Sequence, residues 1–277
     1  MPELPEVETF ARQIRPLVLN KLVDSVTVTE KGLRMVAPSE QSEVTKFLVG
    51  RKIQKILRHG KFLIFKLDND NSVVAHLRMS GRLTVTRNAP DTSPHNRIYI
   101  KFDDASYLNF LDARRFGTFH LVLKDKEYPG VKRLGLDALD GNWSAGLLKK
   151  TFSGHNKIIY RMLLDQNIIA GIGNIYANES LFLSKIHPLK PANMISEPEA
   201  GILLKNIVSI LNSALKFKGT TLIDNSYFDS EGSKGSFSEF LQVYGRESQT
   251  CIICKGQIKR MRISNRSVYY CALCQRL

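Results

Sequence analysis

The N-terminal residues Met1, Pro2 and Glu3 are of types that could perform covalent chemistry on a sugar. A small second residue allows the initiator methionine to be removed, which would leave Pro2 as a secondary amine. An ordinary α-amino group has a pKa of about 7.7–8.0, so part of it is unprotonated and nucleophilic at neutral pH. Its condensation with a sugar carbonyl would give an iminium, whose positive charge promotes elimination of groups β to it. Glu3 and Glu6 are placed to act as general acid and electrostatic stabiliser, although such a start is also common in proteins without this chemistry.

The four cysteines of the chain lie within its last 27 residues and have the spacing C-x2-C-x16-C-x2-C: Cys251, Cys254, Cys271 and Cys274. This is the spacing of a four-thiolate zinc ribbon, in which each sulfur lies about 2.3 Å from the ion. Two disulfides are the alternative, and they are disfavoured because the other 250 residues lack cysteine and no apolar signal segment opens the chain. The same segment carries six Lys or Arg residues and no acid, so a ribbon with zinc would keep a charge of about +4 and attract phosphate.

Lys61 ends a basic segment, residues 51–61, in which five of eleven residues are Lys or Arg. Because Lys61 directly precedes the apolar run of residues 62–65, its amine is expected at the edge of a cleft. The other cations of the segment are expected either to contact phosphate or to lie on a solvated strand face.

Met79, Arg114 and Phe116 lie in two short basic sequences, HLRMSG and RRFGT. Large apolar side chains in such loops are candidate wedges between bases, because proteins that unstack a duplex insert such side chains. The alternative is that Met79 and Phe116 pack in the core.

Asn174 follows two glycines, Gly171 and Gly173, at the expected start of a helix. Asn is a favourable N-cap residue, and a helix N-terminus preceded by glycines can hold phosphate. Alone, this pattern is a weak signal.

The 277 residues include 40 Lys or Arg and 26 Asp or Glu, which gives a net charge of +14. A polyanion is therefore the expected partner, and nucleic acid is the first candidate. A membrane surface is the alternative, but the sequence has no basic amphipathic helix and no apolar run of about 18 residues. With no cysteine outside the ribbon, a reduced cytoplasmic location is expected.

These groups need elements to position them. Residues 7–14 have a helical period, residues 22–123 read mostly as short antiparallel strands with a period of two, and the period becomes helical again after Gly141. Ser196 and Glu199 form a capping-box pattern ahead of a long helix. Residues 218–238 are rich in Gly, Ser, Thr and Asp, and a loop of this length is often functional.

Taken together, these motifs closely resemble the formamidopyrimidine-DNA glycosylases, bacterial base-excision repair enzymes for oxidised purines. The segments that carry the resemblance run in family order over essentially the whole chain: PELPEVET at 2–9, GK at 60–61, HLRMSG at 76–81, RRFGT at 114–118, LLDQ at 163–166, GIGNIYANE at 171–179, HPL at 187–189, QVYGR at 242–246 and the four cysteines. The combination of the PELPEVET start with the C-terminal zinc ribbon is highly specific.

The resemblance implies an α+β fold in three parts. These are an N-terminal β-sandwich with flanking helices (residues 1–140), a helical helix–two-turn–helix domain (141–240) with a lesion-recognition loop at about 218–238, and a zinc-ribbon finger (241–277). It also implies a monomer that binds double-stranded DNA with an oxidised base in the cleft between its halves, no membrane partner, and one structural zinc ion held by four thiolates.

The resemblance further implies the roles of individual residues. Pro2 would attack C1′ of the flipped-out nucleotide and form a Schiff base, and Glu3, Glu6, Lys61 and Arg266 would complete the catalytic set for excision and β,δ-elimination. Met79, Arg114 and Phe116 would fill the gap left by the base, with Arg114 reading the opposite cytosine. Further DNA contacts are expected from His95, His155, Lys157, Asn174 and Tyr244.

Some positions depart from the family pattern. Tyr160 stands where the family usually has a phosphate-binding Lys, for which Arg161 or Lys157 can substitute. His155 falls where an Arg or Lys is usual, and Arg97 replaces the second His of a His-x-His pair whose first member is His95.

Two alternatives remain from the sequence. A sister glycosylase for oxidised pyrimidines shares the mechanism and the ribbon, but its N-terminus departs from PELPEVET and it lacks the long recognition loop that Thr220 opens here. A non-enzymatic damaged-DNA-binding protein on the same fold would be expected to have lost Pro2, Glu3 or Lys61, and all three are present.

Overall fold

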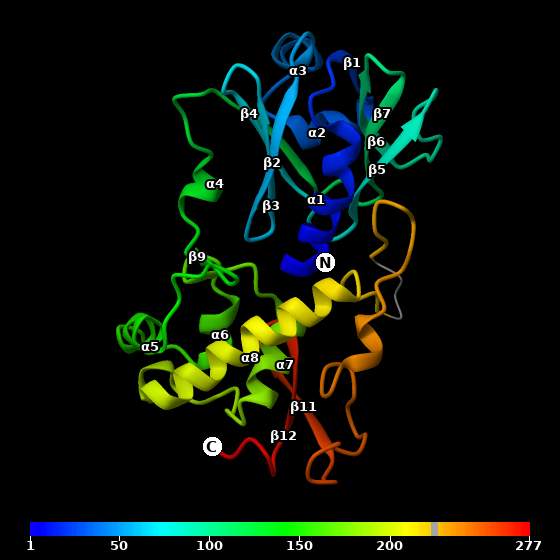
Figure 1. Cartoon of the computed structure of the whole chain (residues 1–277). Helices are drawn as coiled ribbons and strands as arrows, with labels where there is room; N and C mark the ends of the chain where they lie inside the picture. The colour runs from blue at the N-terminus through cyan, green and yellow to red at the C-terminus, as the bar shows by residue number, and fades with distance from the viewer. Residues whose placement is uncertain (223–226) are drawn as a thin grey trace. The chain divides into compact units, whose positions relative to one another are not determined.

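The computed structural model of the chain describes residues 1–222 and 227–277, which form two compact units (Figure 1). The first unit contains Met1–Arg133 with Phe217–Ser236, and the second contains Leu134–Lys216 with Phe237–Leu277. The three-part division expected from the sequence, with boundaries near residues 140 and 240, stays a prediction. Among the described residues, no helix has the length and the apolar character needed to cross a membrane.

Two four-stranded antiparallel sheets make up the β-sandwich of the first unit. The first sheet has the order β1 (Val23–Val28), β6 (Asn96–Phe102), β7 (Ser106–Asp112), β5 (Gly81–Arg87). The second has the order β2 (Ile53–His59), β3 (Phe62–Leu67), β4 (Ser72–His76), β8 (Thr118–Val122). Their inward side chains, such as Phe65 of β3 and Phe110 of β7, share one hydrophobic core.

The alternation read from the sequence is confirmed in these strands. Val26 pairs with Ile100, and both are buried, as are Ile98 and Phe102. The end of the range that reads as strands differs: Leu123 lies beyond the end of β8 and is 58% exposed. The strand pattern of residues 22–123 therefore extends one residue too far.

Helix α1, Leu4–Val18, has the predicted helical period, and its Val7, Phe10 and Ile14 join the core of the sandwich. Residues 22–123 also contain short helices that the strand pattern did not predict: η1 (Glu30–Gly32), α2 (Leu33–Val36) and α3 (Gln41–Leu48). For α3 the local signals are a capping box between Glu40 and Glu43 and the buried pair Val44 and Leu48, one turn apart. Helix α4 (Pro129–Lys132) follows the second sheet.

The second unit is mainly helical. Its elements are β9 (Leu136–Asp137), α5 (Ala145–Ser153), α6 (Ile159–Leu164), β10 (Ile169–Ala170), α7 (Asn174–Leu183), η2 (Ala192–Met194), α8 (Glu197–Lys216), η3 (Phe237–Phe240), β11 (Ile258–Ile263) and β12 (Arg266–Cys271). The capping box ahead of α8 is confirmed, because the Ser196 N–H donates to Glu199 at 2.9 Å and the Glu199 N–H donates back at 3.4 Å.

The C-terminal hairpin of β11 and β12 is fastened to α7. The backbone N–H of Tyr269 donates to Oδ1 of Asn178 at 2.6 Å. Beyond the two elements, Gln275 after β12 donates to the carbonyl of Ile186 after α7 at 2.8 Å. Phe182 of α7 lies in one apolar cluster with Cys251 and Cys271. A two-stranded hairpin is marginal alone, so this packing stabilises it.

Candidate active site

Pro2, Glu3 and Glu6 are all buried at the N-terminal end of α1, and each carboxylate is no more than 3% exposed. Glu3 is the N-cap, and its backbone N–H donates to Oε2 of Glu6 at 2.8 Å. Acidic groups are favourable at a helix N-terminus because the backbone N–H groups there lack partners within the helix. The sequence thus forms a rigid capping box directly beside Pro2.

The second oxygen of Glu6 binds a segment that is distant in the sequence. Oε1 accepts from the backbone N–H of Thr220 at 2.8 Å, next to Gly219, which has a φ of +86°. A Cβ at Gly219 would lie 2.7 Å from the same Oε1, so only glycine fits this approach. Glu6 therefore joins the N-terminus to the start of the loop that the sequence singled out.

Further contacts within the first unit hold the described parts of this loop on α1. The ring of Tyr227 packs edge-on against Phe10 with centroids 5.7 Å apart, and Gln13 donates to Asp229 at 2.8 Å. Burial, with the nearby charges of Glu6 and Asp229, raises the pKa of Tyr227 well above its usual value, so the phenol stays neutral. Residues 223–226 of the expected loop lie outside the described residues.

Lys61 is 6% exposed and lies in the turn between β2 and β3, directly after Gly60, whose φ is +56°. Arg58 braces this turn: its Nη1 donates to the Gly60 carbonyl at 3.0 Å, and its Nε donates to Glu8 of α1 at 2.9 Å. The turn that carries Lys61 is therefore tied to the helix that carries Glu3 and Glu6.

His76 of β4 lies opposite Phe62, next to Lys61, and is 6% exposed. The Arg78 N–H donates to its Nδ1 at 2.9 Å, which leaves the proton of the neutral ring on Nε2. Burial, with the charges of Arg78 and Lys61, lowers the pKa of His76 from 6.5 to about 3. The imidazole is therefore a neutral donor at physiological pH.

This shift predicts a pH dependence of stability. Because the pKa of His76 is lower in the folded state, the unfolded state binds more protons between pH 6.5 and about 3, and the free energy of unfolding falls as the pH falls through this window. At about 1.4 kcal/mol per pH unit, lowering the pH from 6.5 to 5 should remove roughly 2 kcal/mol through His76. Urea unfolding should show this loss in the wild type and a correspondingly flatter profile in His76→Gln. Parallel profiles for the two proteins would contradict the assignment.

The three expected wedge residues lie on exposed loops, which excludes core packing for them. Met79 is 40% exposed and Phe116 is 41% exposed. Two guanidinium groups lie near the Phe116 ring, that of Arg114 at 4.9 Å and that of Arg34 of α2 at 6.0 Å from the centroid. A hollow in this unit is lined by Met1, Arg34, Arg78, Met79, Arg115 and Phe116. The apolar tips are thus surrounded by positive charge, next to the N-terminus.

One buried carboxylate organises both wedge loops. Asp112 is 1% exposed, and its Oδ1 accepts from the Ser80 hydroxyl at 2.5 Å and from the Arg114 N–H at 3.1 Å. Its Oδ2 accepts from the Gly117 N–H at 2.7 Å. Ser80 follows Met79 in the first loop, and Arg114 and Gly117 lie on either side of Phe116 in the second. Asp112 therefore fixes the backbone of both loops.

His95 is exposed, and its partner is Arg97, the residue that replaces the second His of the family's His-x-His pair. Arg97 is 5% exposed and donates to the Asp112 carbonyl at 2.9 Å, while its Nη2 lies 3.3 Å from Nδ1 of His95. Because a guanidinium only donates, Nδ1 of His95 accepts and Nε2 carries the proton.

In the second unit, Asn174 is the first residue of α7, and Gly173 takes the N-cap position that the sequence assigned to Asn174. Its side chain bonds within the protein: Oδ1 accepts from the Tyr160 hydroxyl at 2.6 Å, and Nδ2 donates to the Ser267 carbonyl at 3.2 Å. Arg266 is exposed at the start of β12, directly after the two-residue turn of Ser264 and Asn265.

Tyr244, His155 and Lys157 are the remaining expected contact residues, and all lie in the second unit. The Tyr244 ring packs edge-on against Tyr269 at 5.2 Å, and its N–H donates to the buried Glu179 at 2.8 Å. Lys157 forms an ion pair with Asp165 at 2.9 Å. His155 is partly exposed after the end of α5.

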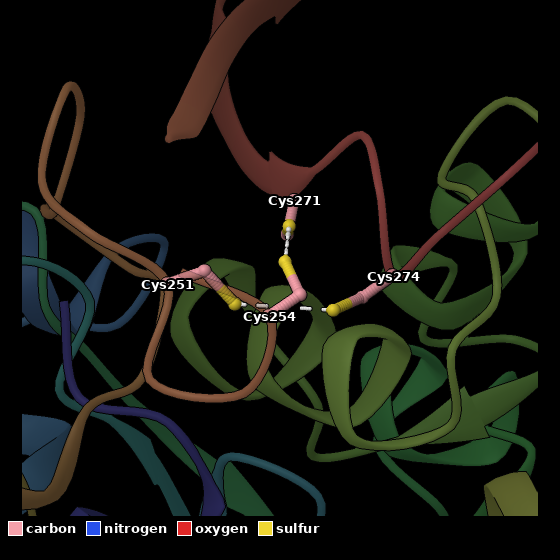
Figure 2. A group of neighbouring side chains, drawn as sticks. All are labelled: Cys251, Cys254, Cys271 and Cys274. Atoms are coloured by element: carbon pink, nitrogen blue, oxygen red, sulfur yellow. Dashed lines mark hydrogen bonds between the residues drawn. The ribbon is translucent and has the colours of Figure 1, made fainter. Parts of the chain in front are cut away.

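The four cysteine sulfurs converge in the second unit, as Figure 2 shows, and all lie within 4.8 Å of one another. The Sγ atoms of Cys254 and Cys271 are 3.3 Å apart, and those of Cys251 and Cys274 are 3.9 Å apart. Zinc–sulfur bonds of about 2.3 Å in a tetrahedron require sulfurs about 3.8 Å apart, so the cluster fits a four-coordinate ion. Four thiolates leave no open position for a reacting water.

Sequence reasoning missed Asp112, His76 and Arg34 as parts of the site. Asp112 directly precedes the RRFGT loop at the end of a strand, where an Asp commonly accepts from the following backbone N–H groups, and this was an available signal. His76 lies in the HLRMSG motif, but its burial is not visible in the sequence. Arg34 comes close to Phe116 only through the tertiary fold.

Two family models match the chain. The Formamidopyrimidine-DNA glycosylase N-terminal domain matches residues 1–119, and the Formamidopyrimidine-DNA glycosylase H2TH domain matches residues 134–226. A formamidopyrimidine-DNA glycosylase from Halalkalibacterium halodurans is 36% identical over 278 aligned residues, covering 100% of both chains.

Solved structures of Lactococcus lactis Fpg are similar over the same length. A complex with abasic-site DNA has a TM-score of 0.90 at 33% identity, covering 99% of this chain and 100% of that chain. A complex with DNA containing N7-benzyl-Fapy-dG has a TM-score of 0.90 at 33% identity, covering 100% of both chains.

Proposed function

The chain belongs to the formamidopyrimidine-DNA glycosylase family, and on this premise we propose that Pro2 carries out the excision of oxidised purines from duplex DNA. The observation that carries the proposal is the capping box of Glu3 and Glu6, which holds two buried carboxylates beside Pro2. The substrates are formamidopyrimidines and 8-oxoguanine, and the enzyme acts in base-excision repair as a DNA glycosylase and AP lyase.

Excision starts at the amine of Pro2 after Met1 has been removed. The nitrogen lone pair attacks C1′, and the C1′–N bond to the base breaks. Glu3 donates a proton to the ring oxygen as the sugar opens, which leaves an iminium between Pro2 and C1′. Lys61, held by the Arg58-braced turn, donates a proton near the lesion. Glu6 supports both the N-terminus and Thr220, so its role is to position Pro2 and the recognition loop.

Strand cleavage follows from the iminium. Loss of a proton from C2′ expels the phosphate on C3′, which is the β-elimination. A second proton loss then expels the phosphate on C5′, which is the δ-elimination. Arg266 assists this second step by binding the lesion phosphate, because a guanidinium suits bidentate bonding to phosphate.

The remaining assigned residues hold and read the DNA. Met79 and Phe116 fill the space of the flipped base, and Arg114 reads the opposite cytosine. His95 offers an Nε2 donor to phosphate, and Tyr244, His155, Lys157 and Asn174 contact the backbone. Lys157 must give up its ion pair with Asp165, and Asn174 has its remaining amide donor for this purpose.

The four cysteines would hold one zinc ion, which would stabilise the hairpin carrying Arg266. Its role would be structural, because four thiolates leave no position for a reacting water. We further propose that the enzyme is a monomer that acts on bacterial DNA in the cytoplasm.

Borohydride trapping tests this function. The intact protein should form a covalent adduct with an 8-oxoguanine:cytosine duplex and with an abasic duplex, and no adduct with an undamaged duplex. A duplex with an oxidised pyrimidine distinguishes the proposed enzyme from the sister glycosylase for oxidised pyrimidines. This duplex should react more slowly than the duplex with the oxidised purine. Absence of any adduct on both damaged duplexes would refute the enzymatic function.

Asp112→Asn should weaken the preference of the enzyme for cytosine over adenine as the base opposite the lesion. The amide keeps the shape, but one of its two positions becomes a donor, so the bond from the Gly117 N–H or the bond from the Arg114 N–H is lost. Because Arg114 reads the opposite base, the ratio of kcat/KM for 8-oxoguanine opposite cytosine and opposite adenine should fall about tenfold.

Single-turnover rates on the two duplexes measure this ratio. Asp68→Asn, in the turn between β3 and β4, is the matched control and should keep the wild-type ratio. If Asp112→Asn slows both duplexes equally, the residue serves stability alone and the assignment is wrong.

A further inference from the structure

The hairpin turn that carries Arg266 is bonded to the helices of the second unit on both of its sides. Before Arg266, the Ser264 hydroxyl accepts from Nη2 of Arg161 at 2.9 Å. After Arg266, the carbonyl of Ser267 accepts from Nδ2 of Asn174 at 3.2 Å. Arg161 belongs to α6 and Asn174 to α7, so two helices hold this one turn.

The amide of Asn174 has a single orientation that satisfies its neighbours. Its Oδ1 accepts from the hydroxyl of Tyr160 at 2.6 Å and from Nδ2 of Asn178 at 3.0 Å. A flipped amide would place its nitrogen against the amide nitrogen of Asn178 and its oxygen against the carbonyl of Ser267. Tyr160 is 1% exposed and Asn178 is fully buried, so this arrangement is rigid.

Tyr160 and Arg161 are consecutive residues, and each stabilises the turn at Ser264 and Asn265 through a different hydrogen bond. Tyr160 acts through Asn174 on the Ser267 side, and Arg161 acts directly on Ser264. Both side chains line a hollow in the second unit together with Leu164, Asp165, Ser264 and Arg266. Arg266 therefore lines the same hollow as the two residues of α6 that hold its turn.

A long exposed side chain at a hairpin tip needs such support. An Arg loses rotamer entropy when it is held in one conformation, and a two-stranded hairpin is flexible when it lacks other contacts. Fixing the backbone on both sides lowers the entropy that Arg266 loses when it binds phosphate. This lower entropy loss speeds only a reaction step that uses Arg266.

We propose that Tyr160 and Arg161 are positioning residues for Arg266, and that they set how much of the product undergoes the second elimination. This inference rests on the proposed function, in which Pro2 drives the first elimination and Arg266 assists the second. Loss of either residue should leave the formation of the iminium nearly unchanged and should slow the δ-elimination.

The test compares the products of an abasic duplex on a sequencing gel. Tyr160→Phe removes the hydroxyl, and Arg161→Gln removes the charge and shortens the donor. In each variant the ratio of β-product to β,δ-product should rise about fivefold, while the rate of borohydride trapping should stay within about twofold of wild type. Arg161→Lys keeps a donor for Ser264 and should restore part of the ratio.

Two controls match the chemistry of these changes. Tyr107→Phe on β7 removes a hydroxyl from the first unit, and Lys205→Gln on α8 removes a cation from the second unit. Both should keep the wild-type product ratio. Tm values within a few degrees of wild type exclude a general loss of structure as the cause of a changed ratio.

Three outcomes have distinct meanings. If the wild type gives both products and the variants keep its ratio, the positioning role is wrong and the proposed function stands. If Arg161→Gln keeps the ratio but lowers the salt dependence of DNA binding by about one charge, Arg161 is a phosphate ligand, and the positioning role is again wrong. If the wild type does not cleave abasic DNA, the proposed function itself fails.

Discussion

Pro2→Gly should form covalent adduct with damaged DNA at least about 100-fold more slowly than the wild type. Glycine still allows Met1 to be removed, so both proteins expose a free α-amine. The glycine amine is primary, and its Schiff base must bind a proton to become an electron sink, whereas the iminium of proline is permanently charged. Glycine also lacks the ring that restricts rotation about the N–Cα bond, so the attacking nitrogen is less well oriented beside Glu3.

Borohydride trapping on the abasic duplex, followed by mass spectrometry of the adduct peptide, measures this effect. Pro5→Ala is the matched control, because Pro5 is a buried proline of the first turn of α1 whose nitrogen is in a peptide bond. That variant should trap at nearly the wild-type rate. Intact mass should show that Met1 is absent from both proteins. Equal trapping by Pro2→Gly and wild type would exclude Pro2 as the nucleophile.

Removal of zinc should weaken DNA binding by roughly two orders of magnitude or more, because the hairpin that carries Arg266 and several other cations would lose its fold. Cys251 and Cys271 are fully buried in a small cluster with Phe182 and Val243. Without the ion, the four cysteine side chains would be separate thiols with no bonds joining them. The remaining apolar contacts are too few to order the hairpin. Structural zinc in finger peptides contributes about 10–16 kcal/mol of apparent binding free energy.

Cys271→Ser tests this without a chelator. Its zinc content should fall from one ion per chain to nearly none, and its Kd for an abasic duplex should rise at fixed salt. Thr250→Ala, next to Cys251 and exposed, is the control and should keep both the zinc and the affinity. Unchanged affinity in a protein shown to be free of metal would refute a role of the ribbon in DNA binding.

Elements with a strong local pattern could be predicted from the sequence. Helix α1 has its apolar residues at helical spacing, the strands alternate, and the capping box at Ser196 starts α8 as expected. The cysteine spacing alone predicted a four-sulfur cluster, because each C-x2-C pair is a local unit. Helix α3 was missed because its three apolar residues, Val44, Phe47 and Leu48, are too few to stand out among strands.

The supporting residues of the site could not be predicted, because their roles come from tertiary contacts. Nothing local shows that one oxygen of Glu6 binds Thr220, or that Arg34 lies against Phe116. The sequence favoured Asn174 as an N-cap, but the glycine before it takes that position and frees the amide for Ser267 and Tyr160. Residue propensity therefore predicted helix α7 correctly but assigned the wrong role to the side chain of Asn174.

The attachment of Phe217–Ser236 to the first unit has a consequence for biosynthesis. A ribosome completes the sandwich strands long before it makes this segment, since all of Leu134–Lys216 lies between them. Until then the ring of Phe10 lacks Tyr227, and Gln13 and Glu6 lack their later partners. The first unit therefore reaches its final stability only after the helices of the second unit have emerged, and a fragment ending at residue 133 should be less stable than the same residues in the whole chain.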